Sequence, residues 1–376
     1  MKLSAVSPYS YWELKQYFSE FDLVVIGSGI VGLSTAISYK QKNKKARVLV
    51  LERGLLPNGA STKNAGFACF GSPSELIDDL HNGPEENVWN TVKMRWDGLA
   101  LLRKRLGDRN LDFKNLGGYE LFNDQELFNQ CLDATTHLNK KMLEVLDLKD
   151  CYTVTQNTHH FNNIKGALFN KYEGQIDTGR MMQSLAFMAQ RLGIEILNNI
   201  AVTAISDLEQ RVELSSAAGT FKARTVVVAT NGFAAELLGI KDVLPARAQV
   251  LITKPIRGLK IEGTYHYQQG YYYFRNIDKR ILFGGGRNLD FETETTTEAG
   301  LNPKIQQELD RLLKEMILPG TRYEVEHRWT GIMGVGKEKA PIIKRVSKNV
   351  LAAVRMGGMG IAIGSWVGEK AADTII

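Results

Sequence analysis

The feature that most constrains this chain is a glycine-rich turn near its N-terminus. Gly27, Gly29 and Gly32 have the spacing Gly-x-Gly-x-x-Gly, and they follow the segment 22–26, which is apolar after its first residue, Asp22, as is typical of a buried parallel strand. In such a turn the first glycine permits the tight bend, the second lets the backbone approach a pyrophosphate, and the third lets the next helix pack closely on the sheet. The free N–H groups at the start of that helix then face the phosphates.

A complete strand–helix–strand unit surrounds this turn. Ile30, Leu33 and Ile37 recur at the spacing of one helix face, and the segment 47–51, apolar after Arg47, predicts a second buried strand. Glu52 ends that strand, where a carboxylate accepts hydrogen bonds from the ribose hydroxyls of adenosine, and an acidic residue there disfavours the 2′-phosphate of NADP. The unit is therefore predicted to bind the ADP half of a dinucleotide.

The rest of the chain changes character several times. Helical patterns rich in leucine and charge run through 74–150, and apolar runs typical of strands return at 194–197 and 225–229. Between 245 and 291 the strands alternate and are aromatic, as in an antiparallel sheet with one face on a core. The last stretch, 349–376, again has a strand, a glycine turn and a helix.

This order predicts an α/β protein of two domains, and a chain of 376 residues is long enough to bury two cores. The first is a doubly wound, Rossmann-like dinucleotide-binding domain, and the second is an α+β substrate domain with a mostly antiparallel sheet. We expect the first domain to comprise 1–73, 151–240 and 326–376, and the second to comprise 74–150 and 241–325.

Three further segments favour FAD over NAD. The segment 59–66 (GASTKNAG) supplies small residues and backbone N–H donors, 230–232 closes a buried strand, and the glycine turn 357–360 leaves room for a flat ring against the backbone. The residues predicted to contact the cofactor are Gly27, Gly29, Ile30, Val31, Gly32, Glu52, Arg53, Ala60, Ser61, Lys63, Asn64, Ala65, Gly66, Thr230, Asn231, Gly232, Gly357, Gly358, Met359, Gly360 and Ile361.

Together these segments resemble the FAD-dependent D-amino acid oxidase superfamily, which includes glycine oxidase, sarcosine oxidase and gamma-glutamylputrescine oxidase. The resemblance covers nearly the whole chain and is most specific in the glycine turn with Glu52, in 59–66 and in 174–180. Segments 10–12 and 282–286 look most like the gamma-glutamylputrescine oxidase branch. The fold that the resemblance implies is a flavin domain plus a substrate domain whose antiparallel sheet covers the flavin ring.

The resemblance also implies how the flavin is held. It adds Val202, whose backbone would contact adenine, to the cofactor residues. Monomeric sarcosine oxidase attaches its flavin through a cysteine in the segment that resembles 328–343 here, and this stretch contains no cysteine. Dimethylglycine dehydrogenase uses a histidine near the position of Lys63 and Asn64. We therefore expect FAD to bind non-covalently.

The run YYYFR that begins at Tyr271 is the most unusual segment outside the cofactor motifs. On a strand, Tyr271, Tyr273 and Arg275 point to one face, while Tyr272 and Phe274 point to the other. An arginine flanked by tyrosine hydroxyls suits a carboxylate held by two parallel charge-assisted hydrogen bonds. The resembling family takes a carboxylate-binding arginine and tyrosine from this sheet, so we expect these three residues in the catalytic site. The alternative is a surface aromatic ladder with the arginine stacked on it.

The resemblance implies the chemistry as well. In that family a hydride leaves the carbon beside an amine for flavin N5, and the resulting imine hydrolyses. The chain is thus expected to oxidise a small carboxylated amine or amino acid and to pass the electrons to O2 or another acceptor, with Lys337, Lys339 or Arg280 as candidate cations beside O2. Two alternatives stay open, namely flavin-dependent oxidation of a 2-hydroxy acid or polyol, and a flavoprotein module without a free amine substrate.

Composition narrows the class further. The net charge of +6 is spread without a dense basic block, which disfavours nucleic acid as a partner and mildly favours anionic substrates. No apolar run is long enough to span a membrane, and 1–20 lacks the apolar core of a secretory signal, so we expect a cytoplasmic protein. The three cysteines have no metal-ligand or disulfide spacing, so no metal site is expected. The sequence does not predict an oligomeric state.

Overall fold

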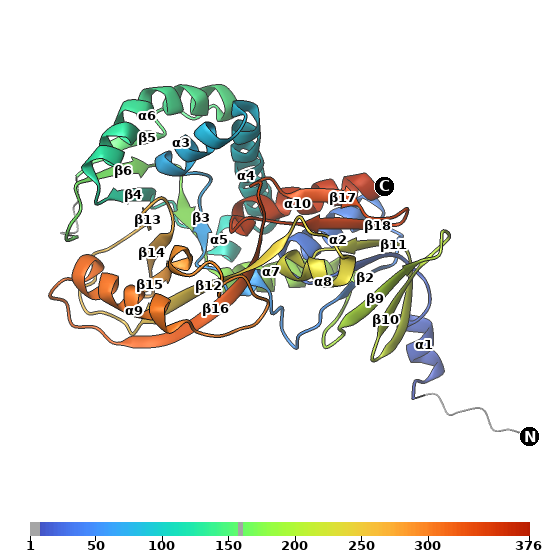
Figure 1. The fold of residues 1–376 in the computed structure, drawn as a ribbon. Helices are drawn as coiled ribbons and strands as arrows, with labels where there is room; N and C mark the ends of the chain where they lie inside the picture. The colour runs from blue at the N-terminus through green and yellow to red at the C-terminus, as the bar shows by residue number, and fades with distance from the viewer. Residues whose placement is uncertain (1–7, 157–160) are drawn as a thin grey trace, which may run out of the picture.

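The computed structural model describes residues 8–156 and 161–376, and its strands form two large sheets (Figure 1). The first sheet contains eight strands, with parallel pairing at its centre. In spatial order they are β17 (Ile342–Arg345), β18 (Val350–Val354), β11 (Gly219–Val228), β1 (Phe21–Ile26), β2 (Val48–Leu51) and β8 (Glu195–Leu197), with β10 (Val212–Ser216) pairing β11 and β9 (Val202–Asp207) pairing β10.

The second sheet also has eight strands and is antiparallel except where β13 meets β4. In spatial order they are β16 (Val325–Val335), β12 (Leu244–Thr253), β15 (Arg280–Gly285), β14 (Tyr272–Ile277), β13 (Thr264–Tyr267), β4 (Gly118–Phe122), β6 (Gly166–Asn170) and β5 (Tyr152–Thr155). A short antiparallel pair, β3 (Phe67–Ala68) and β7 (Gly174–Gln175), completes the described sheets. This architecture confirms the predicted α/β class with its second, mostly antiparallel sheet.

Helices cover both sheets (Figure 1). The α-helices are α1 (Tyr11–Tyr17), α2 (Ile30–Lys42), α3 (Pro73–Asn82), α4 (Glu85–Leu106), α5 (Asp108–Leu111), α6 (Gln125–Leu146), α7 (Thr178–Arg191), α8 (Ala234–Leu238), α9 (Pro303–Leu312) and α10 (Gly360–Ile375). Short helical turns occur at η1 (Ala60–Thr62), η2 (Asn231–Phe233), η3 (Arg287–Leu289) and η4 (Leu313–Ile317). In the described residues no helix has both the length and the apolar character that a membrane crossing requires.

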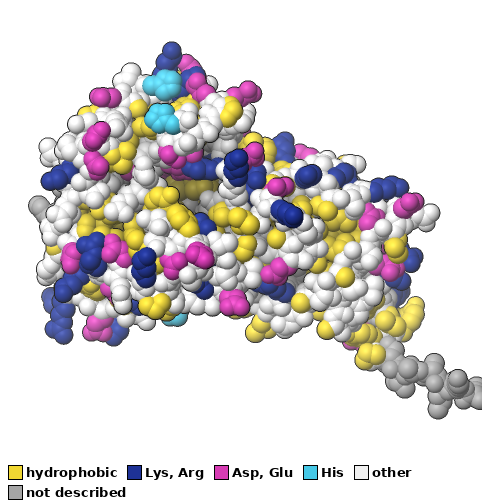
Figure 2. All heavy atoms as spheres, viewed as in Figure 1, with side chains coloured by type: hydrophobic (Ala, Val, Ile, Leu, Met, Phe, Trp, Pro, Cys, Tyr) yellow, Lys and Arg dark blue, Asp and Glu magenta, His cyan; other side chains and the backbone are white. Residues whose placement is uncertain are grey.

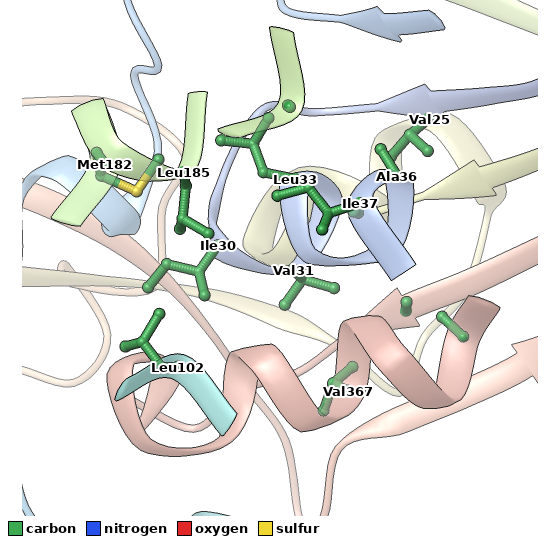
Figure 3. Packing of buried hydrophobic residues seen from close by; sticks show 14 of the residues in the cluster. Val25, Ile30, Val31, Leu33, Ala36, Ile37, Leu102, Met182, Leu185 and Val367 are labelled. Carbon is green, nitrogen blue, oxygen red and sulfur yellow. The ribbon is translucent and has the colours of Figure 1, made fainter. Parts of the chain in front are cut away.

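Helix α2 is the centre of the core around the nucleotide-binding unit. Figure 3 shows Leu33 and Ile37 of α2 surrounded by side chains from α7, α4 and α10, among them Leu185, Leu102 and Val367, all of them buried. Helix α10 approaches α2 closely because it presents glycine there: a Cβ at Gly368 would lie 2.5 Å from the Cβ of Ser34. The C-terminal helix is therefore packed directly on the helix that follows the glycine turn.

Two segments pair in a different sheet from the one that the domain boundaries assumed. The predicted first domain includes strands β5 and β6 within 151–240. In the structure β6 pairs with β4 and β5 pairs with β6, so both strands belong to the second sheet. The predicted first domain also includes β16 from residue 326. Strand β16 pairs along its length with β12 of the second sheet. Apolar alternation identifies a strand but carries no information about its hydrogen-bonding partner, so these boundaries required the tertiary structure.

Candidate active site

A cavity of about 1040 Å³ lies where the first sheet meets the second. Its wall includes the ends of β1, β2 and β11, the segment 59–66, the start of α10 and one face of the sheet around β14. A ligand site at the carboxyl ends of parallel strands is the position expected for this class of sheet. Both sheets therefore contribute residues to one site.

The glycine turn shapes one end of this cavity. Gly27 has φ +102°, and a Cβ there would lie 2.9 Å from the carbonyl oxygen of Ala229, so only glycine suits the position. The N–H of Ile30 donates to Ser61 Oγ at 3.0 Å, while the N-cap residue of α2, Gly29, has no side chain to cap the helix. Gly32 does not line the cavity: a Cβ on it would be 1.9 Å from the oxygen of Gly27. Its role in the structure is to bring the helix against the turn.

Glu52 is a buried carboxylate at the end of β2. Its Oε2 accepts hydrogen bonds from the N–H and hydroxyl of Ser28 at 3.1 and 2.8 Å, and its Oε1 accepts from the N–H of Gly54 at 3.0 Å. A carboxylate has about four acceptor positions, so capacity remains for a ribose hydroxyl. The predicted ribose-binding acid is therefore held rigidly at the cavity wall.

The other predicted cofactor segments meet around the same cavity. One of their features indicates a ligand: the buried hydroxyl of Thr230 has no hydrogen-bond partner among the described residues. The Arg53 guanidinium lies over the ring of Phe233 at 3.7 Å. Gly232 is an exception, because it does not line the cavity. It packs against the backbone of Met333, and a Cβ added to Gly232 would lie 2.3 Å from that residue's carbonyl oxygen. The lining residues from this prediction are Gly27, Gly29, Ile30, Val31, Glu52, Arg53, Ala60, Ser61, Lys63, Asn64, Ala65, Gly66, Val202, Thr230, Asn231, Gly357, Gly358, Met359, Gly360 and Ile361.

These residues fit an extended dinucleotide such as FAD. The orphaned Thr230 hydroxyl and the Glu52 carboxylate can bond polar groups of the cofactor. The N–H groups of the first turn of α2 that follow Ile30, whose own N–H is bound to Ser61, suit the phosphates of the cofactor. Helix α10 also starts at the cavity, without a side-chain cap, after the left-handed Gly358. Its dipole would favour negative charge on a flavin edge there.

The second sheet contributes an aromatic surface to the cavity. Tyr273 of β14 and His266 of β13 line it, and the ring of Phe67 lies edge-on to both, at 5.6 and 5.3 Å between centroids. Burial raises the pKa of Tyr273 to about 12, so its hydroxyl stays protonated and able to donate. Tyr271 also lines the cavity, where it is 41% exposed. Both predicted tyrosines are therefore at the site.

Arg275 lies on the predicted face of β14 but does not line the cavity. Its guanidinium is behind Gly66, 2.7 Å from where a Cβ on that glycine would be. Burial lowers the pKa of Arg275 to about 10, although the negative charge of Asp177 acts to raise it. Gly66 therefore separates the Arg275 guanidinium from the cavity. The role of Arg275 as a carboxylate ligand stays a prediction.

Arg287, in η3, is a cavity-lining cation that the sequence analysis did not single out. No hydrogen bond or ion pair joins its guanidinium to another described residue, and its Nε is buried without a partner. The guanidinium lies over Phe291 at 4.9 Å, and burial lowers its pKa. The signal that could have found it is the glycine run of 284–286, which ends β15 immediately before Arg287.

An ion-pair cluster lies on another side of the cavity. The carboxylate of Glu75 is 3.1 Å from Arg95 and 3.4 Å from Lys339, and Lys339 is 2.6 Å from Asp79. Burial opposes ionisation of Glu75, but Arg95 and Lys339 overcome it and hold the pKa at about 2. Lys339 was a candidate cation beside O2, and it lines the cavity as part of this cluster. Arg280, another such candidate, is paired with Glu326 at 2.8 Å.

A doubly wound sheet whose cavity is closed by an antiparallel sheet is the arrangement of a protein that binds a dinucleotide cofactor. The model of the DAO family, described as FAD dependent oxidoreductase, matches residues 22–374. The chain therefore belongs to this family and is an FAD-dependent oxidoreductase, which confirms the predicted family, cofactor and enzyme class.

Individual relatives are distant but cover most of the chain. A probable oxidoreductase, OrdL, of Haemophilus influenzae is 21% identical over 94% of this chain and 83% of its own length. Glycine oxidase of Bacillus licheniformis is 24% identical over 95% of this chain and 93% of its own. Among solved structures, L-proline dehydrogenase from P. horikoshii superposes with a TM-score of 0.73 at 19% identity, covering 95% and 94% of the two chains. At this identity the structural likeness shows the fold alone.

Proposed function

We propose that this protein oxidises a C–N bond of a small carboxylated amine or amino acid. The observation that carries the proposal is Arg287, an unpaired cation that faces the same cavity as the flavin-binding segments. A cation without a protein counter-ion in a partly buried site suits an anionic ligand. Two of the similar proteins are named for oxidising glycine and proline, and each of these molecules carries a carboxylate beside its C–N bond.

In this proposal the residues of the second sheet bind and orient the substrate. The Arg287 fork holds the carboxylate by two charge-assisted hydrogen bonds, and the protonated hydroxyl of Tyr273 donates a further bond. Tyr271 closes the outer side, where its ring lies 6.2 Å from that of Phe291. FAD, when bound, supplies the two-electron acceptor for the C–N bond. The start of α10, which has no side-chain cap and lines the same cavity, favours negative charge there.

We also propose that FAD is held non-covalently. The segment 328–343 has no cysteine, and Lys63 and Asn64 stand where a related enzyme has a histidine. Both of these side chains line the cavity. Precipitation of the holoprotein with acid should leave the yellow colour in the supernatant. Colour retained in the washed pellet would overturn this part of the proposal.

The experiment that tests the function is an anaerobic titration of the holoprotein. Each amino acid is paired with its hydroxy-acid analogue, for example glycine with glycolate and alanine with lactate, so that only the C–N or C–O bond differs. Bleaching of the flavin absorbance by the amino acid of a pair, and not by the hydroxy acid, is the expected result. Bleaching by hydroxy acids alone would establish the 2-hydroxy-acid alternative. If no member of a broad amine panel bleached the flavin, the module without a free amine substrate would be favoured instead.

A further inference from the structure

The segment 286–302, which joins β15 to α9, connects the cavity to a buried polar cluster behind the second sheet. Its first part lines the cavity through Arg287 and Phe291. Its later part contains Glu294, whose side chain is fully buried and does not line the cavity. One short stretch of chain thus holds both the cation of the proposed substrate site and a buried carboxylate, and a buried carboxylate requires compensating partners.

Two side chains of β12, Arg247 and Gln249, are partners of this carboxylate. Ala248 and Val250 of the same strand line the cavity. Because side chains alternate along a strand, Arg247 and Gln249 point to the opposite face of the sheet, where both are buried. Strand β12 therefore contributes apolar side chains to the cavity and polar side chains to the cluster behind it.

The contact between Arg247 and Glu294 is a bidentate ion pair. The Nε and Nη2 atoms of Arg247 donate to the two carboxylate oxygens of Glu294 at 2.9 and 2.8 Å. The backbones are joined at the same place, since the N–H of Arg247 donates to the carbonyl of Glu294 at 2.8 Å. The Nη1 atom donates to the carbonyl of Glu298 at 3.3 Å. A bidentate pair fixes direction as well as distance, so the segment is attached to β12 in one orientation.

Neutral groups complete the cluster. The amide of Gln249 donates to Glu294 at 3.1 Å. The amide of Asn302 donates to Glu294 at 3.1 Å and to Asp290 at 2.9 Å. The amide of Gln306, on α9, donates to Gln249 Oε1 at 2.8 Å. None of these side chains has a buried polar atom without a partner in the described part of the chain, and a fully satisfied buried network specifies one arrangement of the segment.

The position of Arg287 depends on the backbone that carries it. Its guanidinium lies over the ring of Phe291, and its buried Nε has no partner among the described residues. The N–H of Asp290 donates to the carbonyl of Arg287 at 3.1 Å, and the N–H of Glu294 donates to the carbonyl of Asp290 at 3.1 Å. Two successive turns therefore connect Arg287 to the residue that is held by the ion pair.

We propose that Arg247 and Glu294 are positioning residues for the carboxylate site, because their ion pair behind the sheet holds the segment 286–302 with Arg287 facing the cavity. This inference rests on the proposed function, in which Arg287 binds the substrate carboxylate. Without the ion pair the segment shifts and the guanidinium fork no longer meets the carboxylate in line. The flavin site is unaffected, since the segments assigned to FAD lie elsewhere in the chain.

Two variants of the ion pair and one control test this role. Arg247→Lys keeps the charge but loses the two-pronged contact. The double variant Arg247→Met with Glu294→Met removes the pair without leaving a buried charge unpaired. Arg311→Lys is the matched control, because Arg311 forms a bidentate pair with Glu308 at 2.8 and 2.7 Å on the exposed side of α9.

The assay measures binding of benzoate and of its neutral analogue benzamide from the flavin spectrum of the holoprotein, so no oxidation is required. Both variants of the ion pair should raise the dissociation constant of benzoate about tenfold, because a charge-assisted hydrogen bond that is out of line is lost. Benzamide binding and flavin content should stay unchanged, and Arg311→Lys should alter neither. Amide hydrogen exchange within 287–294 should be faster in both variants.

Flavin content and melting temperature identify a variant that has not folded, and if Arg247→Lys does not fold, the double variant decides alone. Unchanged benzoate binding in a folded variant, or equal weakening of benzamide, would overturn the positioning role. Arg287→Ala separates this result from failure of the proposed function. If Arg287→Ala abolishes the preference for benzoate and the variants of the ion pair keep it, only the positioning role fails. If the native protein shows no such preference, or Arg287→Ala keeps it, the carboxylate site fails and the positioning role fails with it.

Discussion

Replacing Arg287 with alanine tests the proposed substrate site most directly. The guanidinium lines the cavity and has no hydrogen bond to the described residues, so a bound carboxylate would be its first partner. Two charge-assisted hydrogen bonds, at about 1.5 kcal/mol each for this partly exposed site, give a loss of about 3 kcal/mol. This loss corresponds to a roughly 150-fold larger dissociation constant for a carboxylated ligand.

The assay measures the dissociation constant anaerobically from the flavin spectrum, for a carboxylated amine that the titration has shown to bind and for its analogue without the carboxylate, with proline and pyrrolidine as the example pair. Arg287→Ala should weaken proline binding and leave pyrrolidine binding within a factor of about three. Arg287→Lys, which keeps the charge but loses the fork, should fall between the two. Arg275→Lys is the matched control, because Arg275 lies behind Gly66. The reasoning is refuted if proline binding survives Arg287→Ala, and Arg275 becomes the carboxylate ligand if its own substitution abolishes that binding.

Three further predictions concern the cofactor site and the ion pairs. Gly32→Ala places a Cβ 1.9 Å from a backbone oxygen and should destabilise the protein by about 3 kcal/mol with loss of flavin. The control Gly83→Ala lies away from the cavity and meets its nearest heavy atom at 3.6 Å, so it should change neither the melting temperature nor the absorbance ratio at 450 and 280 nm. Thr230→Val should weaken FAD binding about fivefold in a fluorescence titration of the apoprotein, and unchanged affinity would show that the orphaned hydroxyl does not bind cofactor. The pKa of Glu75 is about 2 in the folded state, below its unfolded value, so its contribution to stability is complete above about pH 4.5 and is lost as the pH falls toward 2. Glu75→Gln leaves the buried Arg95 without its charged partner, so it should lower the free energy of unfolding in urea at pH 7 by about 3 kcal/mol. It should also flatten the dependence of stability on acidic pH. An unaltered pH profile would contradict the assignment of that dependence to Glu75.

Local patterns predicted the nucleotide half of the site because that half is built from neighbours in the chain. Gly27, Gly32 and Glu52 belong to one strand–helix–strand unit, so spacing alone sets their relative positions. The roles of the glycines also followed from backbone sterics. The second sheet was predicted in type but not in full extent, since β5, β6 and β16 join it through partners distant in sequence.

The substrate half shows where pattern reasoning ends. Alternation correctly assigned Tyr273 and Arg275 to one face of β14, with Tyr272 and Phe274 buried in the core on the other. It could not show that Gly66 crosses in front of Arg275, nor that a turn after β15 brings Arg287 to the cavity instead. Side-chain direction repeats every two residues along a strand, but depth relative to a cavity depends on segments packed from elsewhere.

The sequence by itself determined the cofactor and the family of this protein. A dinucleotide requires the glycine turn, Glu52 and the small-residue segments at short sequence spacings. These spacings can be recognised without the tertiary structure. Only the tertiary structure decided that Arg287 lines the cavity together with the cofactor segments and that Arg275 lies behind Gly66. These residues come from separate segments, and packing of the two sheets brings them together.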